Sequence, residues 1–442
     1  MHPHHTLNDE IKSVLEQIPK VDAQWEVCFI RKKIFSIEGK DLIVEKQRNA
    51  FKEIFFVRVI KDKKIGFSFT NEKSKIKETF DSALSCAMVT DRDEFLEIPE
   101  PSLISEVAVF DETLSNSIDN LSKYLINMQR AAFFDKRIKK LRNAEIDIAI
   151  NEIGIINSKG LAVFQPFTSV AYHIIAIAED SDSQMGWAFK AERFIKNLSF
   201  EEVGMEAGKK ALMLLNSKKI TPFKGWAVLD PYVGSEFLSL VSQSLSAENF
   251  QMGKSIFCGK IGHHVVNDSL NIIDDGLIPE KFGSTPFDAE GVPTSKKVLI
   301  EKGILKSLMH NQYTAKRTGF EKSTGNAVRT DRGITVGPTN LYIDTDGDKI
   351  SPEEIIKVVD KGVYIIEVMG MHTANPVSGD FSVGISGIYI EKGEFKYPVK
   401  ETVISGNILE VFKNIKAVGN DLNFFGNIGS PTLLVEGIDI SG

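Results

Sequence analysis

A short stretch near the C-terminus, residues 371 to 387, reads MHTANPVSGDFSVGISG and carries residue types that could do chemistry. His372, Ser378 and Asp380 have the composition of a hydrolytic triad, but triad members normally converge from separate segments of a chain. No GxSxG motif, the strained turn that exposes a nucleophilic serine, occurs in the sequence. The spacing therefore argues against a triad.

Two interpretations of this stretch remain open. Its Asn, Thr and Gly backbone groups could pair with an extended peptide, with His372 or Asp380 anchoring one end of it. Alternatively the stretch is a turn shaped by Asn375, Pro376 and Gly379, in which Asp380 caps a backbone N–H group. The two interpretations are balanced for His372, and the turn is favoured for Asp380.

Two further groups of polar residues lie earlier in the chain. Asp288 and Glu290 could act as an acid/base pair, but alternate side chains on a strand or turn tend to diverge, which favours a solvated role. Thr324, Gly325 and Asn326 have the composition of a tight turn that approaches a cleft. We predict that Asp288, Glu290, Thr324 and Asn326 contribute to substrate binding, together with His372, Asn375 and Asp380.

Metal binding has little support from spacing. His263 and His264 are adjacent, so on a strand they would point to opposite faces and could not chelate one ion together. Cys258 precedes them at no standard ligand spacing. The acidic run DTDGD at 344 to 348 lacks the glycine and the glutamate of a calcium loop and is better interpreted as a turn.

The elements that must position these residues follow from the hydrophobic periodicity. Apolar segments between Trp25 and Thr70 predict a meander of strands, and residues 76 to 88 predict a helix that covers the sheet. The pattern breaks at 97 to 102. A second unit begins with a helix from Leu114 to Met128, continues with strands, and ends with a helix over 199 to 216, where Ser199 and Glu202 have capping-box spacing.

A linker at 217 to 222 leads into a third unit that is rich in glycine and strand signals. Ser351, Pro352 and Glu354 predict a helix start there. Strands grouped with helices on one side, without regular βαβ alternation, predict an α+β fold with mixed or antiparallel sheets. We expect three domains, at residues 1–110, 111–222 and 223–442.

Composition excludes several classes of protein. The net charge is -7, so no global field would attract nucleic acid or anionic lipid. The three cysteines are far apart and odd in number, which favours neither a disulfide framework nor a zinc clip and is typical of a reducing cytoplasm. No apolar stretch approaches the roughly 20 residues of a membrane span. Without GxGxxG after a strand or GxxxxGK[ST], nucleotide binding is also unsupported.

The stretch MHTANPVSGDFSVGISGIYIEKGEFKYPVKETVISGN resembles the C-terminal signature of the TldD/PmbA family, which is related to metallopeptidases and was once labelled as modulators of DNA gyrase. Residues 284 to 329, with Asp288 to Thr294, Ala315-Lys316 and Thr324-Gly325-Asn326, resemble the run that precedes it in the family. KAVGNDL at 416 to 422 and GFSFTNE at 66 to 72 resemble two further blocks. The resemblance covers nearly the whole chain in the family's motif order.

The resemblance implies one of two kinds of subunit. The TldD type carries HExxxH on a helix of the third unit and a cysteine near the C-terminus, which together form a zinc site, whereas the PmbA (TldE) type lacks both. The corresponding helix here is DPYVGSEFLSLVSQSLSAEN at 230 to 249, capped by Asp230 and Pro231. Residues 238 to 243 take the HExxxH positions, and a shift of one or two residues still brings in no histidine. The segment FFGNIGSPTLLVEG, which corresponds to the cysteine-bearing end, also offers no ligand.

We therefore expect a PmbA/TldE-type subunit that processes peptides or unfolded proteins with a TldD-like homologue or with itself as a dimer, holds no zinc of its own, and binds neither membranes nor nucleic acid. Two alternatives stay open. One is an autonomous metallopeptidase with unusual ligands from His263, His264, His372 and Asp380. The other is a gyrase-binding regulator, which rests on the family's older label.

Overall fold

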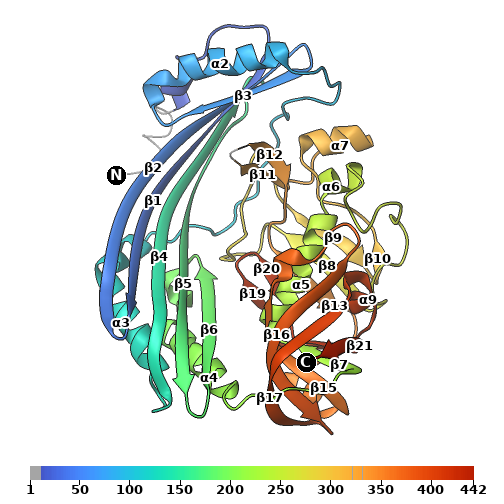
Figure 1. Ribbon diagram of the computed structural model, residues 1–442. Helices are drawn as coiled ribbons and strands as arrows, with labels where there is room; N and C mark the ends of the chain where they lie inside the picture. Colours follow the sequence, from blue (N-terminus) through green and yellow to red (C-terminus); the bar gives the residue numbers. More distant parts are fainter. Residues whose placement is uncertain (1–10, 321, 331) are drawn as a thin grey trace.

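The computed structural model describes residues 11–320, 322–330 and 332–442. Its N-terminal half is built on six antiparallel strands in the order β3-β2-β1-β4-β5-β6. Figure 1 shows the long strands curving side by side. Their bounds are β1 Gln24–Lys40, β2 Ile43–Lys61, β3 Lys64–Thr70, β4 Ile138–Asn157, β5 Ala162–Glu179 and β6 Ser183–Glu192.

This sheet runs through both of the first two units that the sequence suggests. β1 pairs with β4, which follows it by about a hundred residues, and Phe29 lies opposite Gly154 in their register. A side chain at Gly154 would meet the Phe29 ring at 2.1 Å, so the close packing at this point requires glycine. The interval from 97 to 110 contains neither helix nor strand among its residues.

Three helices cover one face of the sheet, and the first of them, at residues 76 to 88, was expected to do so. α2 (Ile76–Val89) buries Ile76, Phe80 and Ala83 against strand residues that include Phe55. α3 (Leu121–Ala132), preceded by a 3₁₀ turn at Leu114–Asn120, and α4 (Phe200–Met213) cover the strands β4 to β6. The predicted helices are confirmed, but the capping box at Ser199 is wrong, because its hydroxyl accepts a hydrogen bond from Lys190 instead.

The C-terminal half contains a closed ring of five strands. β7 pairs with β15 in parallel and with β21 antiparallel, while β16 and β17 complete the ring between β15 and β21. Closure leaves these five strands with no edge that runs their full length. The bounds are β7 Phe223–Leu229, β15 Lys361–Met369, β16 Asp380–Glu391, β17 Glu394–Asn407 and β21 Leu433–Ser441, and β14 Lys349–Ile350 and β18 Ile415–Gly419 extend the sheet at β21.

A second sheet in the order β10-β9-β8-β13-β20-β19 packs with this ring around α5 (Pro231–Ser244). Phe237, Leu238 and Val241 of α5 belong to the largest core cluster, which also holds Ile365 and Phe381 of the ring. The sheet strands are β8 Leu270–Asp275, β9 Lys296–Glu301, β10 Ile304–Leu305, β13 Leu341–Thr345, β19 Asn423–Phe425 and β20 Ile428–Ser430.

The remaining elements are short. They are α6 Ala247–Gln251, α7 Gln312–Thr318, α8 Pro352–Lys357, α9 Ile408–Lys413 and the hairpin of β11 Ala327–Thr330 and β12 Gly333–Val336. The predicted capping box of Ser351 and Glu354 is present at the start of α8. The acidic run after Thr345 is a turn, as expected, in which the Thr345 hydroxyl accepts the Gly347 N–H. The predicted α+β class with mixed and antiparallel sheets is confirmed.

None of the helices in the described part of the chain is long and apolar enough to cross a lipid bilayer.

Candidate functional site

The helix that the resemblance places at a zinc site is α5, and its start forms as its sequence predicts. Asp230 accepts the Tyr232 N–H at 3.0 Å and Pro231 occupies the first helical position. The Tyr364 hydroxyl donates to the other Asp230 oxygen at 2.8 Å. Burial raises the pKa of Asp230, while these donors and Lys210 act in the opposite direction. The helix therefore begins at a fixed point of the core.

The two segments that the resemblance assigns to a zinc site in TldD-type chains lie side by side here. α5 packs along β19 and β20, the segment that corresponds to the family's cysteine-bearing end. A side chain at Gly234 would come within 2.2 Å of the Ser430 hydroxyl, and the Tyr232 and Phe425 rings are 5.3 Å apart. The fold thus brings the two segments together, and no imidazole, thiolate or carboxylate stands at residues 238 to 243 of α5.

The residues at these positions do not fit a zinc ion. Leu238 and Val241 are buried in the apolar core, and the Ser242 hydroxyl donates to the Ser239 carbonyl at 2.7 Å. Zinc sites in proteins need imidazole, thiolate or carboxylate donors, and α5 offers none of these at residues 238 to 243. Across the described residues, no three His, Cys, Asp or Glu side chains gather in a group that could hold a metal.

The unusual ligand set considered from the sequence is not assembled into such a group. His263 and His264 are exposed, with the His263 Nδ1 3.2 Å from the Ile261 carbonyl and the His264 Nδ1 3.0 Å from Asp268. The Cys258 thiol lies 3.6 Å from the Phe250 carbonyl, also at the surface. Each of these groups makes a local contact on its own loop or with a near neighbour.

A cavity of about 450 Å³ lies between β5 and β6 of the first sheet and the strands β15, β16 and β17 of the ring. β6 is the last strand of its sheet, and no strand among the described residues pairs with its outer edge. The Trp187 ring of β6 lies 5.0 Å from the Tyr232 ring of α5, so the cavity reaches the start of the helix. Its lining includes Met185, Trp187, Tyr232, Glu367, Met369 and Ser386.

Half-buried carboxyl groups surround Tyr232 in this region. Burial raises the pKa of Glu367 and of Glu236, and burial together with these two acids raises the pKa of Tyr232 to about 12. Aromatic rings and methionines can hold apolar side chains, while the carboxyl groups can accept N–H donors of a ligand. The cavity therefore offers apolar contacts and hydrogen-bond acceptors to a ligand, and none of these residues is an activated nucleophile.

The loop at 371 to 380 is an exposed turn beside the C-terminal end of α5. Asn375 accepts the N–H groups of Val377 and Ser378 at 2.9 and 3.2 Å, and Gly379 has a φ of +84°. The Ser244 hydroxyl donates to the Pro376 carbonyl at 3.3 Å. These contacts agree with the turn interpretation. His372 is exposed in the 3₁₀ turn Met371–Thr373.

Asp380 was expected to cap a backbone N–H group, and that detail is wrong. Its carboxylate accepts the side-chain amide of Asn407 at 2.9 Å, and this bond, with Ser378, lowers the pKa of Asp380. The Ser378 hydroxyl accepts the Asp380 N–H at 3.3 Å. None of the hydrogen bonds within the described ranges joins His372 to Ser378 or to Asp380, so the loop does not form a triad.

Asp288 and Glu290 are buried, so the interpretation as solvated carboxylates is wrong. They are 5% and 1% exposed, in a turn where Asp288 accepts the N–H groups of Glu290, Val292 and Ala327 at 2.9 to 3.0 Å. Burial and the neighbouring Glu290 raise the pKa of Asp288 to about 7. The alternation of residues in the sequence does not reveal a turn in which the Asp288 carboxylate accepts backbone N–H groups of the same turn.

Glu290 belongs to a cluster of buried charges that sequence reasoning missed, formed by Glu26, Arg58, Glu290 and Arg329. Arg58 donates to Glu290 at 2.6 Å and to Glu26 at 2.7 Å, and Arg329 donates to Glu26 at 2.5 Å. Glu290 also accepts the Gln312 N–H at 2.8 Å. Charged residues inside apolar strand segments, as in WEVCF and FFVRVI, are the sequence signal that could have indicated it.

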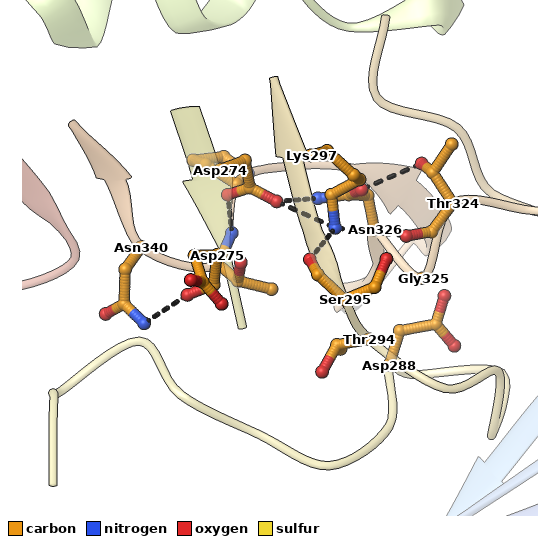
Figure 2. A network of polar contacts seen from close by, with 12 residues as sticks. Asp274, Asp275, Asp288, Thr294, Ser295, Lys297, Thr324, Gly325, Asn326 and Asn340 are labelled. Carbon is orange, nitrogen blue, oxygen red and sulfur yellow. Dashed lines mark hydrogen bonds and ion pairs between the residues drawn. The ribbon is translucent and has the colours of Figure 1, made fainter. Parts of the chain in front are cut away.

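Thr324, Gly325 and Asn326 form the tight turn that was expected, inside a polar network that Figure 2 shows. The Asn326 side chain donates to Asp274 at 2.8 Å and to the Gly337 carbonyl at 3.1 Å, and the Thr324 hydroxyl donates to Asn326. Lys297 pairs with Asp274 at 3.0 Å. Gly325 has a φ of +74° and packs against the Pro293 carbonyl, so glycine is required there.

The predicted binding residues therefore fall into two groups. Asp288, Glu290, Thr324 and Asn326 share one buried region, because Asp288 accepts the N–H of Ala327, the residue after Asn326. His372, Asn375 and Asp380 lie on the exposed loop. In the described ranges no hydrogen bond connects the two groups, and the first group has the contacts of a structural network.

His310 lies beside this network and provides a pH test of it. Burial lowers the pKa of His310 to about 4, and its ring packs against Phe320 at 5.2 Å. Because the unfolded chain binds a proton near pH 6.5 and the folded chain does not, stability falls as the pH drops through this window. Between pH 7 and pH 5 we expect wild type to lose about 2 kcal/mol more unfolding free energy than the His310→Phe variant.

Urea denaturation of both proteins at the two pH values measures this difference. The raised pKa of Asp288 makes the folded state more stable as the pH falls over the same window. Both proteins contain Asp288, so this contribution cancels when their stability losses are compared. Equal losses in the two proteins would contradict the assignment of a neutral His310 in the folded state.

Comparison with known proteins gives consistent matches along the chain. Family models match at residues 25–87, 111–215 and 224–442, described as PmbA/TldA metallopeptidase domain 1, central domain and C-terminal domain. An uncharacterized protein of Methanocaldococcus jannaschii, MJ0231, is 30% identical over 97% of this chain and 99% of its own length. The metalloprotease PmbA of Escherichia coli O157:H7 is 27% identical over 71% of this chain and 68% of its own.

Solved structures are similar over the full length. TM0727 from Thermotoga maritima, named for modulation of a DNA gyrase, has a TM-score of 0.91 with 29% identity, covering 98% of this chain and 100% of its own. TldE from Thermococcus kodakarensis has a TM-score of 0.88 with 25% identity, covering 99% of each chain.

Proposed function

Because the chain belongs to the PmbA/TldD family of metallopeptidases, we propose that it is a zinc-free subunit of a two-subunit proteolytic assembly that processes peptides or unfolded proteins. The observation that carries this proposal is that α5 packs against β19 and β20 without zinc-ligand side chains. The segments that correspond to the ligand segments of a TldD-type chain are adjacent here, with Leu238 and Gln243 in place of the two imidazoles of HExxxH and Ser239 in place of its carboxylate.

The chain's own contribution is peptide binding in the cavity beside Trp187 and Tyr232. An extended substrate would add to the free edge of β6 through backbone hydrogen bonds, which accept many sequences. Apolar side chains of the substrate would lie against Trp187 and Met185, and Glu367 would accept N–H groups. A TldD-like partner would supply the zinc ion and the activated water. TldE of Thermococcus kodakarensis, similar over the whole chain, supports this type of subunit.

We place the assembly in the cytoplasm. Cys28, Cys86 and Cys258 are all free thiols, with Cys28 buried and the other two exposed. Exposed free cysteines persist where the compartment is reducing.

The test compares two samples: the purified chain alone, and the chain mixed with a homologue that carries HExxxH. We expect the chain alone to hold well under one zinc per molecule and to leave an unfolded, fluorescently labelled casein uncut. The mixture should cleave it, and 1,10-phenanthroline should stop the reaction. Stoichiometric zinc in the isolated chain, with cleavage that the chelator abolishes, would overturn the proposal.

The cavity is tested in the same mixture by Trp187→Ala in this chain. Removing the ring takes away much of the apolar wall, so we expect the KM for peptide cleavage to rise by about tenfold, corresponding to roughly 1.4 kcal/mol. Phe134→Ala, at a half-exposed ring away from the cavity, is the matched control and should leave the KM unchanged. Equal values for both variants would remove the cavity from the proposal.

A further inference from the structure

The outer edge of β2 is open over more than half of its length. β3 pairs with β2 only from Phe55 to Lys61, whereas β1 pairs with it from Ile43 onward. Within the described chain, no strand pairs with the outer side of residues 43 to 54. Figure 1 shows β2 as the outermost long strand of the sheet. An open edge of this length presents a row of unpaired backbone N–H and C=O groups.

Both faces of this segment are exposed, and it is held in place at its ends. Every residue from Asp41 to Lys52 is exposed, including the Phe51 side chain at 60%. At the hairpin tip the Leu42 N–H donates to Gln129 at 2.7 Å, and Asp41 accepts the Leu141 N–H at 2.7 Å. Because α3 and β4 anchor the tip, the edge is a preformed strand, which lowers the entropy cost of pairing.

A second copy of the chain is a poor partner for this edge. Two copies of this strand could pair antiparallel about a two-fold axis that passes through one residue. A residue a given number of positions after that central residue then faces, in the other copy, the residue the same number of positions before it. If the axis passes through Lys46 or Arg48, that residue faces the same residue of the second copy. If it passes through Gln47, Lys46 of each copy faces Arg48 of the other. Like charges directly opposite each other destabilise a strand pair.

Registers centred on Asn49, Ala50 and Phe51 are also unfavourable. An axis at Asn49 sets Lys46 against Lys52, and an axis at Ala50 sets Arg48 against Lys52. An axis at Phe51 avoids like charges, but it would place Gln47 where Thr70 of the copy's β3 already pairs with Phe55. The charges on this edge therefore act against self-association, as charged residues on sheet edges commonly do.

The same charges select a different partner. Lys46, Arg48 and Lys52 share one face of the edge, where Glu38 lies 3.1 Å from Lys46 and 3.3 Å from Arg48. The two acids of the segment, Glu45 and Glu53, lie on the other face and pair with Lys40 and Arg31. Lys52 lies opposite Lys32 in the β1 register, which adds positive charge to this face. A strand with acidic residues at alternate positions would meet these cations with opposite charges.

We propose that the free edge of β2 between Ile43 and Ile54 is a docking strand for an extended, acidic segment of a different protein chain, and that its charges exclude a second copy. This site lies on the first sheet at the edge opposite to β6, and it is independent of the peptide cavity.

Binding is tested with a fluorescein-labelled nonapeptide that alternates glutamate and valine, in low salt. We expect it to bind at least about tenfold more tightly than the matched peptide with lysine in place of glutamate, and to slow hydrogen exchange of the Ile43–Ile54 amides. K46E/R48E should weaken its binding by at least about tenfold, whereas K209E, on the exposed surface of α4, should not. Equal affinities for the two peptides, or unchanged exchange at this edge, would overturn the docking site.

Exclusion of a second copy is tested by sedimentation equilibrium. In the register about Gln47, K46E converts two repulsive contacts with Arg48 into two attractive ones. We therefore expect K46E to raise the average mass above that of wild type at equal concentration, and K46E/R48E to return it to the wild-type value. If K46E leaves the mass unchanged, the exclusion by charge is wrong.

Discussion

Glu26→Ala is expected to destabilise the protein by about 3–5 kcal/mol, because it leaves buried cations without their partner. Glu26 is completely buried and accepts hydrogen bonds from Arg58 and Arg329. Burial alone would raise its pKa, but the charges of the two arginines hold the pKa of Glu26 below its ordinary value. Arg329 would keep the Ala289 carbonyl, at 2.7 Å, as an acceptor.

A double variant distinguishes the cost of leaving a buried arginine unpaired from the cost of the cavity that Glu26→Ala creates. In Glu26→Leu/Arg329→Met, one complete pair is replaced by apolar side chains, while Arg58 keeps Glu290 at 2.6 Å. We expect this variant to lose less than about 2 kcal/mol, since replacing both members of a buried pair is often close to neutral. The two substitutions are then strongly non-additive, as contacting residues commonly are.

The control is an ion pair with the same chemistry at the surface. Arg92 and Glu94 are 2.6 Å apart with both side chains 63% exposed, so Glu94→Ala should change stability by less than about 1 kcal/mol. Urea denaturation of the four proteins gives the comparison. A Glu26→Ala variant as stable as Glu94→Ala would show that water or rearrangement compensates the buried arginines.

The sequence predicted local structure well where one segment contains all of the information. The start of α5 at Asp230 and Pro231 and the capping box of Ser351 and Glu354 need only neighbouring residues, and both form as expected. The capping box at Ser199 fails because a distant residue, Lys190, takes the hydroxyl. Local patterns of this kind hold until a tertiary contact competes for the same group.

The candidate site was harder to predict because its residues are defined by distant contacts. Asp288 and Glu290 have the spacing of two solvated acids, and only the approach of Arg58 from β2 explains why Glu290 can be buried. Likewise, the cavity beside Trp187 needs β6 and the ring strands to meet across the chain. A lone charge within an apolar strand, such as Arg58, is the one clue that periodicity leaves visible.

A buried arginine contributes contacts between the first sheet and the C-terminal half, in addition to those of the Glu26, Arg58, Glu290 and Arg329 cluster. Arg193, at the end of β6, is 6% exposed and donates to the carbonyls of Thr168, Lys281 and Ser284 at 2.9 to 3.0 Å, and to that of Phe282 at 2.5 Å. The Phe167 and Phe282 rings lie 5.3 and 5.7 Å from its guanidinium carbon. Burial lowers the pKa of Arg193 to about 10, so it stays charged at neutral pH.

Arg193→Ala is expected to cost about 4 kcal/mol, because four carbonyl groups lose this donor together and a buried acceptor left unpaired costs about 1–3 kcal/mol before water compensates. The Lys281 carbonyl still accepts the Ser284 N–H at 3.1 Å. Arg193→Lys should recover less than half of the loss, since one ammonium group cannot reproduce the planar fork of donors. Arg137→Ala, at a largely exposed pair with Asp135, is the control and should leave the free energy of unfolding nearly unchanged.

The measurement combines urea denaturation with limited proteolysis of the native protein. Because Arg193 joins β5 and β6 to the segment 281–284 of the C-terminal half, its loss should expose that segment to protease before the protein unfolds as a whole. A stability loss without earlier cleavage there would mean that Arg193 supports the first sheet alone. Full recovery by lysine would show that charge, and not the geometry of four carbonyl contacts, holds the two halves together.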